Sequence, residues 1–372
     1  MANVIWLPGK YCQGRGILGE LGKYILPYGK KPFILWEQFL KDSYGDKIIA
    51  SLQAHGLSFH DAIFSGESTK RAAHEFSDVV RAEGCDVVVG IGGGKAIDTA
   101  KGTAAFSQTR VIIVPTIASN DAPSSACTVW YTEEGEYDGF EMWTTNPDVI
   151  IADTEVIAKA PVRFFVAGMG DALATWLEAS TCFAKRAVAC TGGVQTITAM
   201  AMARLCFDTI LEYGLEAKFA VERKSVTAAV DKVVEANILL SGVGWESGGL
   251  ATAHAIANSL PAIHETHGFL HGEKVSFGLI TQLCLDQDLS IEEVYKVVDF
   301  QVAVGLPVTF SDLKMQDVSR ERLLDFAKSI AGEGCEGSFV NNHPFTISPA
   351  DIVEAMFAAD SLGTRRKQLA KK

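Results

Sequence analysis

Short hydrophobic runs alternate with amphipathic helical patterns over roughly the first 155 residues of the chain. Residues 33–36 precede a helical pattern that ends near residue 52, residues 86–91 precede another over 95–105, and residues 111–114 end at Pro115. Because nearly every residue of these runs is apolar, they are typical of parallel strands buried on both faces. The pattern predicts an α/β domain with a mainly parallel, Rossmann-like sheet, which binds ligands beyond the carboxyl ends of its strands.

The hydrophobic pattern changes after Pro161. Residues 149–152 form the last strand-like run, and the later hydrophobic residues recur at helical spacing over 171–184, 193–213, 226–242, 248–260 and 271–285. A chain of 372 residues also exceeds what one hydrophobic core usually organises. We therefore expect an α/β domain over residues 1–160 and an all-α domain over residues 161–372.

Charge and composition exclude several classes of protein. The formal net charge of -12 argues against a nucleic-acid partner, since such proteins normally carry a basic face. No signal-peptide pattern and no stretch of about 18 apolar residues is found, so we expect a cytoplasmic protein without a membrane span. The eight cysteines are scattered without a C-x-x-C pair, which favours reduced packing residues over a disulfide framework.

A glycine-rich turn, Gly90-Ile91-Gly92-Gly93-Gly94-Lys95, joins the run at 86–91 to the next helix. Three consecutive glycines let backbone N–H groups approach a pyrophosphate, and the helix N-terminus adds partial positive charge. The spacing is neither G-x-G-x-x-G nor a P-loop, so the motif alone fits an ordinary tight turn equally well. Glu37, at the end of an earlier hydrophobic run, could accept hydrogen bonds from ribose hydroxyls and repel a 2′-phosphate, which favours NAD over NADP.

A polar loop, residues 115–125, follows the run at 111–114 at the edge where open α/β sheets bind ligands. It concentrates hydroxyls, an amide and the carboxylate of Asp121. Taken alone, it is also compatible with an ordinary loop in which Asp121 forms an Asx turn.

One carboxylate and two imidazoles in the second half could form a metal site. Asp171 follows Gly168-Met169-Gly170 at the predicted start of a helix, His254 lies within an apolar helical segment, and His271 opens another helix. This set suits a catalytic zinc, which keeps its remaining positions for water or substrate. Individually, Asp171 is also typical of a helix N-cap and His254 of a hydrogen-bonded core histidine.

Four of the eight histidines fall between residues 254 and 271, which strengthens the metal interpretation. His254 and His271 are far enough apart for two helices to converge on one ion. His264 and His267 lie in the connecting segment, where exposure or a supporting role is expected.

Four motifs in the same order resemble the glycerol dehydrogenase branch of the iron-containing alcohol dehydrogenase superfamily. They are residues 92–101, 115–123, 168–172 and 267–275, and the resemblance covers essentially the whole chain. It implies NAD-dependent oxidation of glycerol, or of a related vicinal diol, to a hydroxyketone such as dihydroxyacetone. Zinc would be held by Asp171, His254 and His271, and Asp121 would contact the polyol substrate. Relatives form ring-like octamers, so a homo-oligomer is expected.

The resemblance also makes residues 1–160 the NAD-binding domain and residues 161–372 the metal- and substrate-binding domain. It further implies which residues lie along the cofactor. They are Glu37, the turn residues Gly92, Gly93, Gly94, Lys95, Ala96, Ile97 and Asp98, the stretch Thr116, Ile117, Ala118 and Ser119, and finally Ser125, Cys127 and Tyr131.

Three positions depart from the family pattern. Many relatives have Asp in place of Glu37, and close relatives often have His in place of Ala257. Iron-type members have a fourth ligand, a His, where this chain has Thr175, which favours the zinc branch with three ligands.

In the implied reaction the metal coordinates two adjacent hydroxyl oxygens and lowers the pKa of one, and a hydride passes to the nicotinamide. Asp121 and a metal-bound water remain alternative proton acceptors. The alternatives are a glycerol-phosphate or 2-hydroxy-acid dehydrogenase and a dehydroquinate-synthase-like lyase on the same scaffold. A phosphate substrate would need several Lys or Arg residues at the metal pocket, and the segment 245–275 contains only Lys274. A non-catalytic binding protein ranks last.

Overall fold

The computed structural model describes residues 1–285 and 289–372, and these divide into two compact units. The sheet unit contains residues 6–161 and 220–242, and the helical unit contains residues 1–5, 162–219 and 243–372. The main boundary follows residue 161, one residue beyond the boundary expected from the hydrophobic pattern. Two segments group differently from that expectation: 220–242 belongs with the sheet, and 1–5 belongs with the helices.

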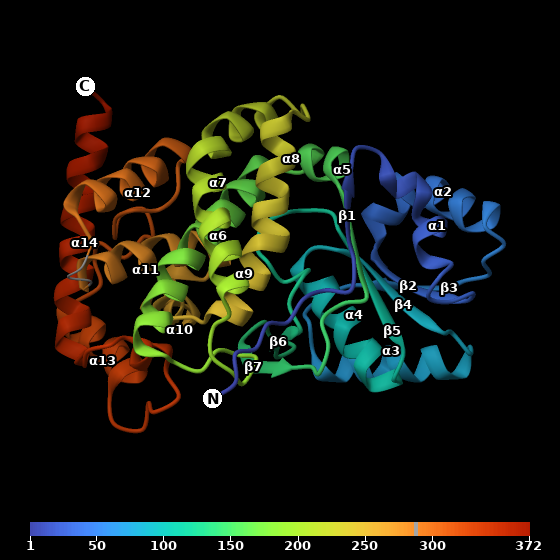
Figure 1. Cartoon of the computed structure of the whole chain (residues 1–372), viewed down its shortest axis with the longest axis horizontal. Coiled ribbons are helices and arrows are strands. Elements are labelled where there is room, and N and C mark those ends of the chain that lie inside the picture. The colour runs from blue at the N-terminus through green and yellow to red at the C-terminus, as the bar shows by residue number, and fades with distance from the viewer. Residues whose placement is uncertain (286–288) are drawn as a thin grey trace. The chain divides into compact units, whose positions relative to one another are not determined.

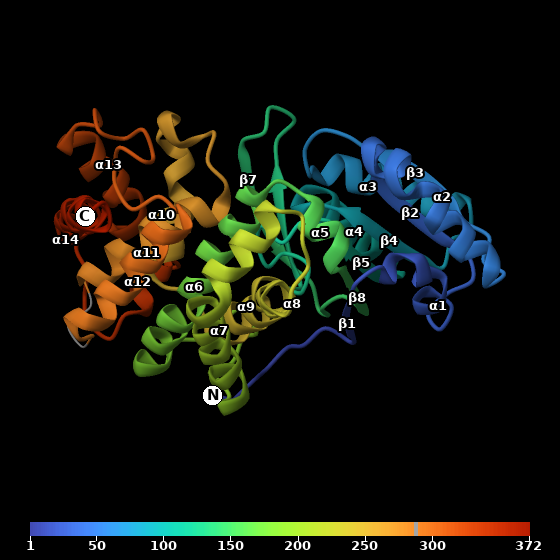
Figure 2. The same ribbon diagram turned by 90° about the horizontal axis from the view of Figure 1, so that it is seen from above.

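The sheet unit is built on six parallel strands in the order β1-β8-β5-β4-β2-β3 (Figure 1 and Figure 2). The strands are β1 (Tyr11–Gly14), β2 (Pro32–Glu37), β3 (His60–Phe64), β4 (Val87–Gly92), β5 (Arg110–Pro115) and β8 (Val149–Asp153). Their flanking helices are α1 (Leu21–Ile25), α2 (Gln38–Ala54), α3 (Lys70–Ala82), α4 (Gly94–Ser107) and α5 (Thr154–Lys159).

Hydrophobic cores cover both faces of this sheet, which explains the uninterrupted apolar runs in the sequence. Ile34 and Trp36 of β2 belong to a core with α1 and α2, whereas Phe33 and Leu35 belong to a second core with α3 and α4. Successive side chains of a strand point to opposite faces, so a strand covered on both sides needs an apolar residue at every position. The predicted α/β class with a parallel sheet is confirmed.

A helical segment with a π-helix accounts for the grouping of residues 220–242 with the sheet. Helix α8 (Ala228–Glu235) continues through a π-helix (Ala236–Leu240) into α9 (Ser241–Gly248). The Asn237 side chain donates to the carbonyl oxygen of Ala118 at 3.0 Å, and the Ser124 hydroxyl donates to the carbonyl oxygen of Ile238 at 2.5 Å. These bonds attach the π-helix to the polar loop after β5. The spacing of hydrophobic residues along the sequence could not predict this attachment. A hairpin, β6 (Cys127–Tyr131) and β7 (Tyr137–Met142), follows that loop.

Helices make up the helical unit, as the sequence predicts. In its described residues the only β pairing is an isolated bridge between Asn3 and Val194. The helices are α6 (Val162–Lys185), most of α7 (Ile197–Glu222), most of α9, α10 (Thr252–Ser259), α11 (His271–Leu285), α12 (Ile291–Val304), α13 (Arg320–Ala331) and α14 (Pro349–Ala370). Helix α11 packs against α6, α10 and α14 (Figure 2).

The cysteines and the helix lengths bear on two predictions from composition. All eight cysteines are free thiols. Among the described residues, no helix combines the length and the apolar character that a membrane crossing requires.

Candidate metal centre and cofactor turn

Asp171, His254 and His271 lie together in the helical unit, on α6, α10 and α11. The Nε2 atoms of His254 and His271 are 3.2 Å and 3.4 Å from the same atom, Asp171 Oδ1. One ligand atom from each residue can be chosen so that all three lie within 4.8 Å of one another. The three residues singled out from the sequence are thus brought to one point.

Asp171 does not have the helix position that the sequence suggested. Helix α6 begins at Val162, so Asp171 lies well inside it and cannot act as its N-cap. The glycines before Asp171 do not start a helix but allow close packing. A Cβ on Gly170 would lie 2.4 Å from the carbonyl oxygen of Gly272, and a Cβ on Gly272 would lie 1.8 Å from that of Ala167. Only glycine at both positions lets the backbones of α6 and α11 approach so closely, and this contact brings Asp171 beside His271.

The environment of Asp171 fits a bound cation. The residue is 1% exposed, and its Oδ2 atom has no hydrogen-bond partner among the residues that the structure describes. A buried polar atom without a partner costs about 1–3 kcal/mol, and more when it is charged. A metal ion would supply the missing interaction, and one carboxylate with two imidazoles is a ligand set that zinc and iron both accept.

Glu178 supports this cluster and was missed in the sequence. Its buried carboxylate accepts a hydrogen bond from His254 Nδ1 at 2.5 Å and two more from the backbone N–H groups of Ala251 and His254, at 2.8 Å and 2.9 Å. A carboxylate on Nδ1 fixes the imidazole tautomer and leaves Nε2 directed at Asp171. The available signal was its spacing, since Glu178 follows Asp171 by two helical turns within an apolar segment.

The charges of the cluster outweigh the effect of burial. Burial alone raises the pKa of the Asp171 carboxyl, but His271 and His254 together hold that pKa below its usual range. Burial lowers the pKa of the His254 imidazole, whereas Glu178 and Asp171 raise it well above its ordinary value. Because a metal binds a deprotonated imidazole, a metal ion held by this cluster would displace a proton.

The other two histidines of the sequence cluster lie outside the ligand set. The rings of His264 and His267 contact each other with centroids 4.9 Å apart, and His267 Nε2 donates to the carbonyl oxygen of Pro261 at 2.5 Å. Thr175 and Ala257, the two residues of this unit that depart from the family pattern, are both buried.

The glycine turn of the sheet unit presents an open helix N-terminus. Gly92 ends β4, and Gly93 precedes α4 with extended backbone and no side-chain cap. A Cβ on Gly93 would lie 3.0 Å from the Ile117 side chain, and a Cβ on Gly94 would lie 3.2 Å from the Asn120 amide. The loop after β5 therefore packs tightly over the turn. Uncapped N–H groups beside glycines fit an anionic group such as a pyrophosphate.

Glu37 lies beside this turn because β2 and β4 are neighbours in the sheet. A Cβ on Gly92 would be 3.5 Å from Glu37 Oε2. Burial raises the pKa of the Glu37 carboxyl. The carboxylate thus stands at the carboxyl end of the strand next to the glycine turn, where the adenosine ribose is expected.

Two further predicted cofactor residues contact each other. The Lys95 ammonium lies over the Tyr131 ring, 5.7 Å from its centroid, and pairs with Glu67 at 2.5 Å. Burial, with smaller effects of Asp98 and Glu67, raises the pKa of the Tyr131 hydroxyl to about 12.

Asp98, another predicted cofactor residue, makes contacts that hold the fold together. Its buried carboxylate pairs with Lys101 at 2.8 Å and accepts from the backbone N–H of Val129 at 3.1 Å. Lys101 in turn donates to the carbonyl oxygens of Cys127 and Ala122, so this pair ties α4 to the hairpin and the polar loop.

The remaining predicted cofactor residues surround the turn mainly through backbone or packing. Thr116 N–H donates to the carbonyl oxygen of Gly92 at 3.0 Å. Ala96 and Ile97 pack in the core between α4 and the sheet, Ser125 is buried, and Ser119 is half-buried.

Asp121 lies in the polar loop of the sheet unit, where its Oδ2 accepts a hydrogen bond from the Ser241 hydroxyl at 2.5 Å. The Asx interaction in this loop is made by Asn120, whose Oδ1 accepts from the backbone N–H of Ala122 at 3.3 Å. The Asp121 carboxylate is therefore oriented by the end of the π-helical segment. Ser241 was not singled out in the sequence.

Comparisons with known proteins match the chain over almost its full length. The family described as iron-containing alcohol dehydrogenase matches residues 8–154. The chain is 42% identical to a glycerol dehydrogenase of Citrobacter freundii over 98% of both chains, and 45% identical to that of Thermotoga maritima over 99% of this chain and 100% of the relative. The crystal structure of glycerol dehydrogenase from Schizosaccharomyces pombe has a TM-score of 0.93 at 34% identity, covering 100% of this chain and 93% of that chain.

Proposed function

Because the chain belongs to the iron-containing alcohol dehydrogenase family, we propose that it oxidises glycerol or a related vicinal diol to a hydroxyketone, with NAD as hydride acceptor. The family predicted from four sequence motifs is confirmed. The observation that carries the proposal is the cluster of Asp171, His254 and His271, with its buried carboxylate oxygen, in a chain so similar to glycerol dehydrogenases. The dehydroquinate-synthase-like lyase and the glycerol-phosphate dehydrogenase have no comparable support.

Zinc is the proposed metal, and Asp171, His254 and His271 would hold it. When bound, a zinc ion would act as a Lewis acid toward two adjacent substrate hydroxyls. Glu178 would keep the Nε2 lone pair of His254 directed at the ion. Thr175 supplies no imidazole at the fourth ligand position of the iron-type relatives, which supports zinc over iron.

NAD is the proposed cofactor, and its nicotinamide would accept the hydride. The open N-terminus of α4 would bind the pyrophosphate through backbone N–H groups, since Gly93 and Gly94 leave them unobstructed. Glu37 would accept hydrogen bonds from ribose hydroxyls and repel a 2′-phosphate. Asp121, oriented by Ser241, would hydrogen-bond a substrate hydroxyl.

Self-association is also proposed. Helix α7 exposes Ile197, Leu205 and Phe219, which are 87%, 54% and 54% exposed. Their spacing of 8 and 22 residues along the helix places all three toward one side of α7, and apolar side chains gathered on one exposed surface are typical of protein–protein interfaces. Light scattering would give a homo-oligomer, whereas a stable monomer would contradict this part of the proposal.

The substrate class is tested by measuring NAD reduction with glycerol, simple alcohols, 2-hydroxy acids and glycerol phosphate. Adjacent hydroxyl oxygens can chelate one ion, so diols should give the highest kcat/KM. A higher value for a 2-hydroxy acid or a phosphate ester would replace the diol with that alternative.

A further inference from the structure

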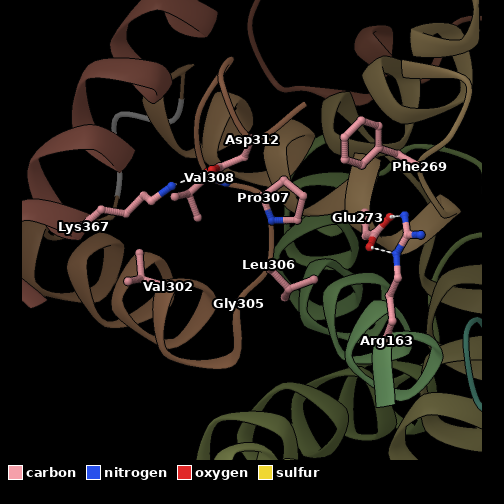
Figure 3. Close-up of a pocket in the computed structure, with 10 residues that line it drawn as sticks. All are labelled: Arg163, Phe269, Glu273, Val302, Gly305, Leu306, Pro307, Val308, Asp312 and Lys367. Atoms are coloured by element: carbon pink, nitrogen blue, oxygen red, sulfur yellow. Dashed lines mark hydrogen bonds and ion pairs between the residues drawn. The ribbon is translucent and has the colours of Figure 1, made fainter. Parts of the chain in front are cut away.

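A bidentate ion pair joins α6 to the start of α11 (Figure 3). Arg163, the second residue of α6, donates from Nε and Nη2 to Oε1 and Oε2 of Glu273, both at 2.7 Å. Glu273 is the third residue of α11 and only 9% exposed. Two parallel bonds between a planar guanidinium and a carboxylate fix both the distance and the orientation of the two groups.

The same two side chains also hold the turn before α11. Glu273 Oε2 accepts a hydrogen bond from the backbone N–H of Leu270 at 2.8 Å, and Arg163 Nη2 donates to the carbonyl oxygen of Gly268 at 3.0 Å. Residues 268, 270 and 273 are therefore all attached to one point on α6. His271 lies between these attachments.

His271 is the ligand that most needs such support. Its side chain is 34% exposed, compared with 7% for His254 and 1% for Asp171, so packing restrains it least. Helix α6 already carries Asp171, and through Glu178 it orients His254. Through Arg163 the same helix reaches the third ligand.

We propose that Arg163 and Glu273 are positioning residues of the metal centre, which hold His271 within reach of Asp171 before the metal binds. The inference rests on the proposed metal site, and it adds two residues that contact no metal themselves. A preorganised ligand binds its ion more tightly because less conformational entropy is lost on binding.

Arg163 and Glu273 line a pocket, and a second ion pair in that pocket provides a matched control. The pocket has a volume of about 350 Å³, and Figure 3 shows Lys367 and Asp312 on its other side. They pair at 2.5 Å, and Asp312 also accepts from the backbone N–H groups of Val308 and Thr309. This pair likewise fastens a turn to a helix, but its described contacts lie outside residues 268–273.

Zinc affinity, measured on the full chain by competition with a chromogenic chelator, tests the proposal. Arg163→Met and Glu273→Gln should weaken zinc binding by up to about 10-fold, less than the roughly 10- to 100-fold that follows loss of a direct partner of a ligand, because both residues act on His271 through the backbone of residues 268–273. Arg163→Lys should fall between Arg163→Met and the wild type, because an ammonium cannot form both bonds. Lys367→Met should bind zinc as the wild type does.

Melting temperatures of the metal-free proteins separate positioning from general stability. Arg163→Met and Lys367→Met both remove one ion pair, so a similar loss of stability with different zinc affinities supports the proposal. Wild-type affinity in Arg163→Met and Glu273→Gln, or an equal loss in Lys367→Met, would overturn it. Absence of zinc binding by the wild type would instead refute the proposed metal site itself.

Discussion

Replacing Glu178 by Gln tests how the metal centre is organised, because the change keeps the size of the side chain and alters its hydrogen bonding. One carboxylate oxygen of Glu178 accepts from two backbone N–H groups, and the other accepts from His254 Nδ1. Glutamine has a single acceptor oxygen. If that oxygen keeps the two backbone bonds, the amide NH₂ must face Nδ1.

An NH₂ group facing Nδ1 favours the imidazole tautomer whose proton is on Nε2. That proton would point toward Asp171 Oδ1, which lies 3.2 Å from Nε2. The nitrogen would then have no lone pair available for a metal. To accept from Nδ1–H instead, the glutamine oxygen would have to give up its two backbone hydrogen bonds, each contributing about 0.5–1.5 kcal/mol, so zinc affinity should fall roughly 10- to 100-fold.

Zinc titration with a competing chelator would measure this loss, and Gln282→Met provides a control. Gln282 accepts from the backbone N–H of Ala253 at 2.9 Å, next to His254, without contacting its ring in the described hydrogen bonds. Gln282→Met should lower the melting temperature and leave zinc affinity nearly unchanged. A folded Glu178→Gln variant that binds zinc as tightly as the wild type would show that Glu178 does not set the tautomer of His254.

Three further predictions concern the ligands, the cofactor and the substrate contact. His271→Ala should lose bound zinc and activity while remaining folded, and full zinc occupancy by elemental analysis would remove His271 from the ligand set. NAD should give a higher kcat/KM than NADP, because Glu37 would face a 2′-phosphate of about −1.5 to −2 charges, and equal values would place Glu37 away from the ribose. Asp121→Asn should keep its zinc but lose about ten- to a hundredfold in kcat/KM, and unchanged kinetics would withdraw Asp121 from the active site.

The strands that could be predicted from the sequence are those buried on both faces. Strands β2, β4, β5 and β8 have mainly buried residues and appear in the sequence as apolar runs. The observed strands contain nearly all residues of the predicted runs. Strands β1 and β3 lie at the sheet edges and are only partly buried, so they have no such run. The exposed hairpin strand β7 was missed for the same reason.

The candidate ligands could be selected by residue type, whereas the partners that support them depend on tertiary contacts. The Gly168-Met169-Gly170 sequence suggested a helix start, but the structure uses Gly170 for the contact with Gly272 inside α6. Glu178 lies 76 residues from His254, and Ser241 lies 120 residues from Asp121. No local spacing rule connects residues so far apart, and only the packing of the helices and of the polar loop brings them together.

Zinc-dependent oxidation is tested most directly by following glycerol-dependent NAD reduction while the metal is removed and returned. The protein as isolated should oxidise glycerol with NAD, a chelator should abolish this activity without unfolding the chain, and about one zinc per chain should restore it. Full activity in protein shown by elemental analysis to contain no metal would mean that the chain needs no metal for this reaction.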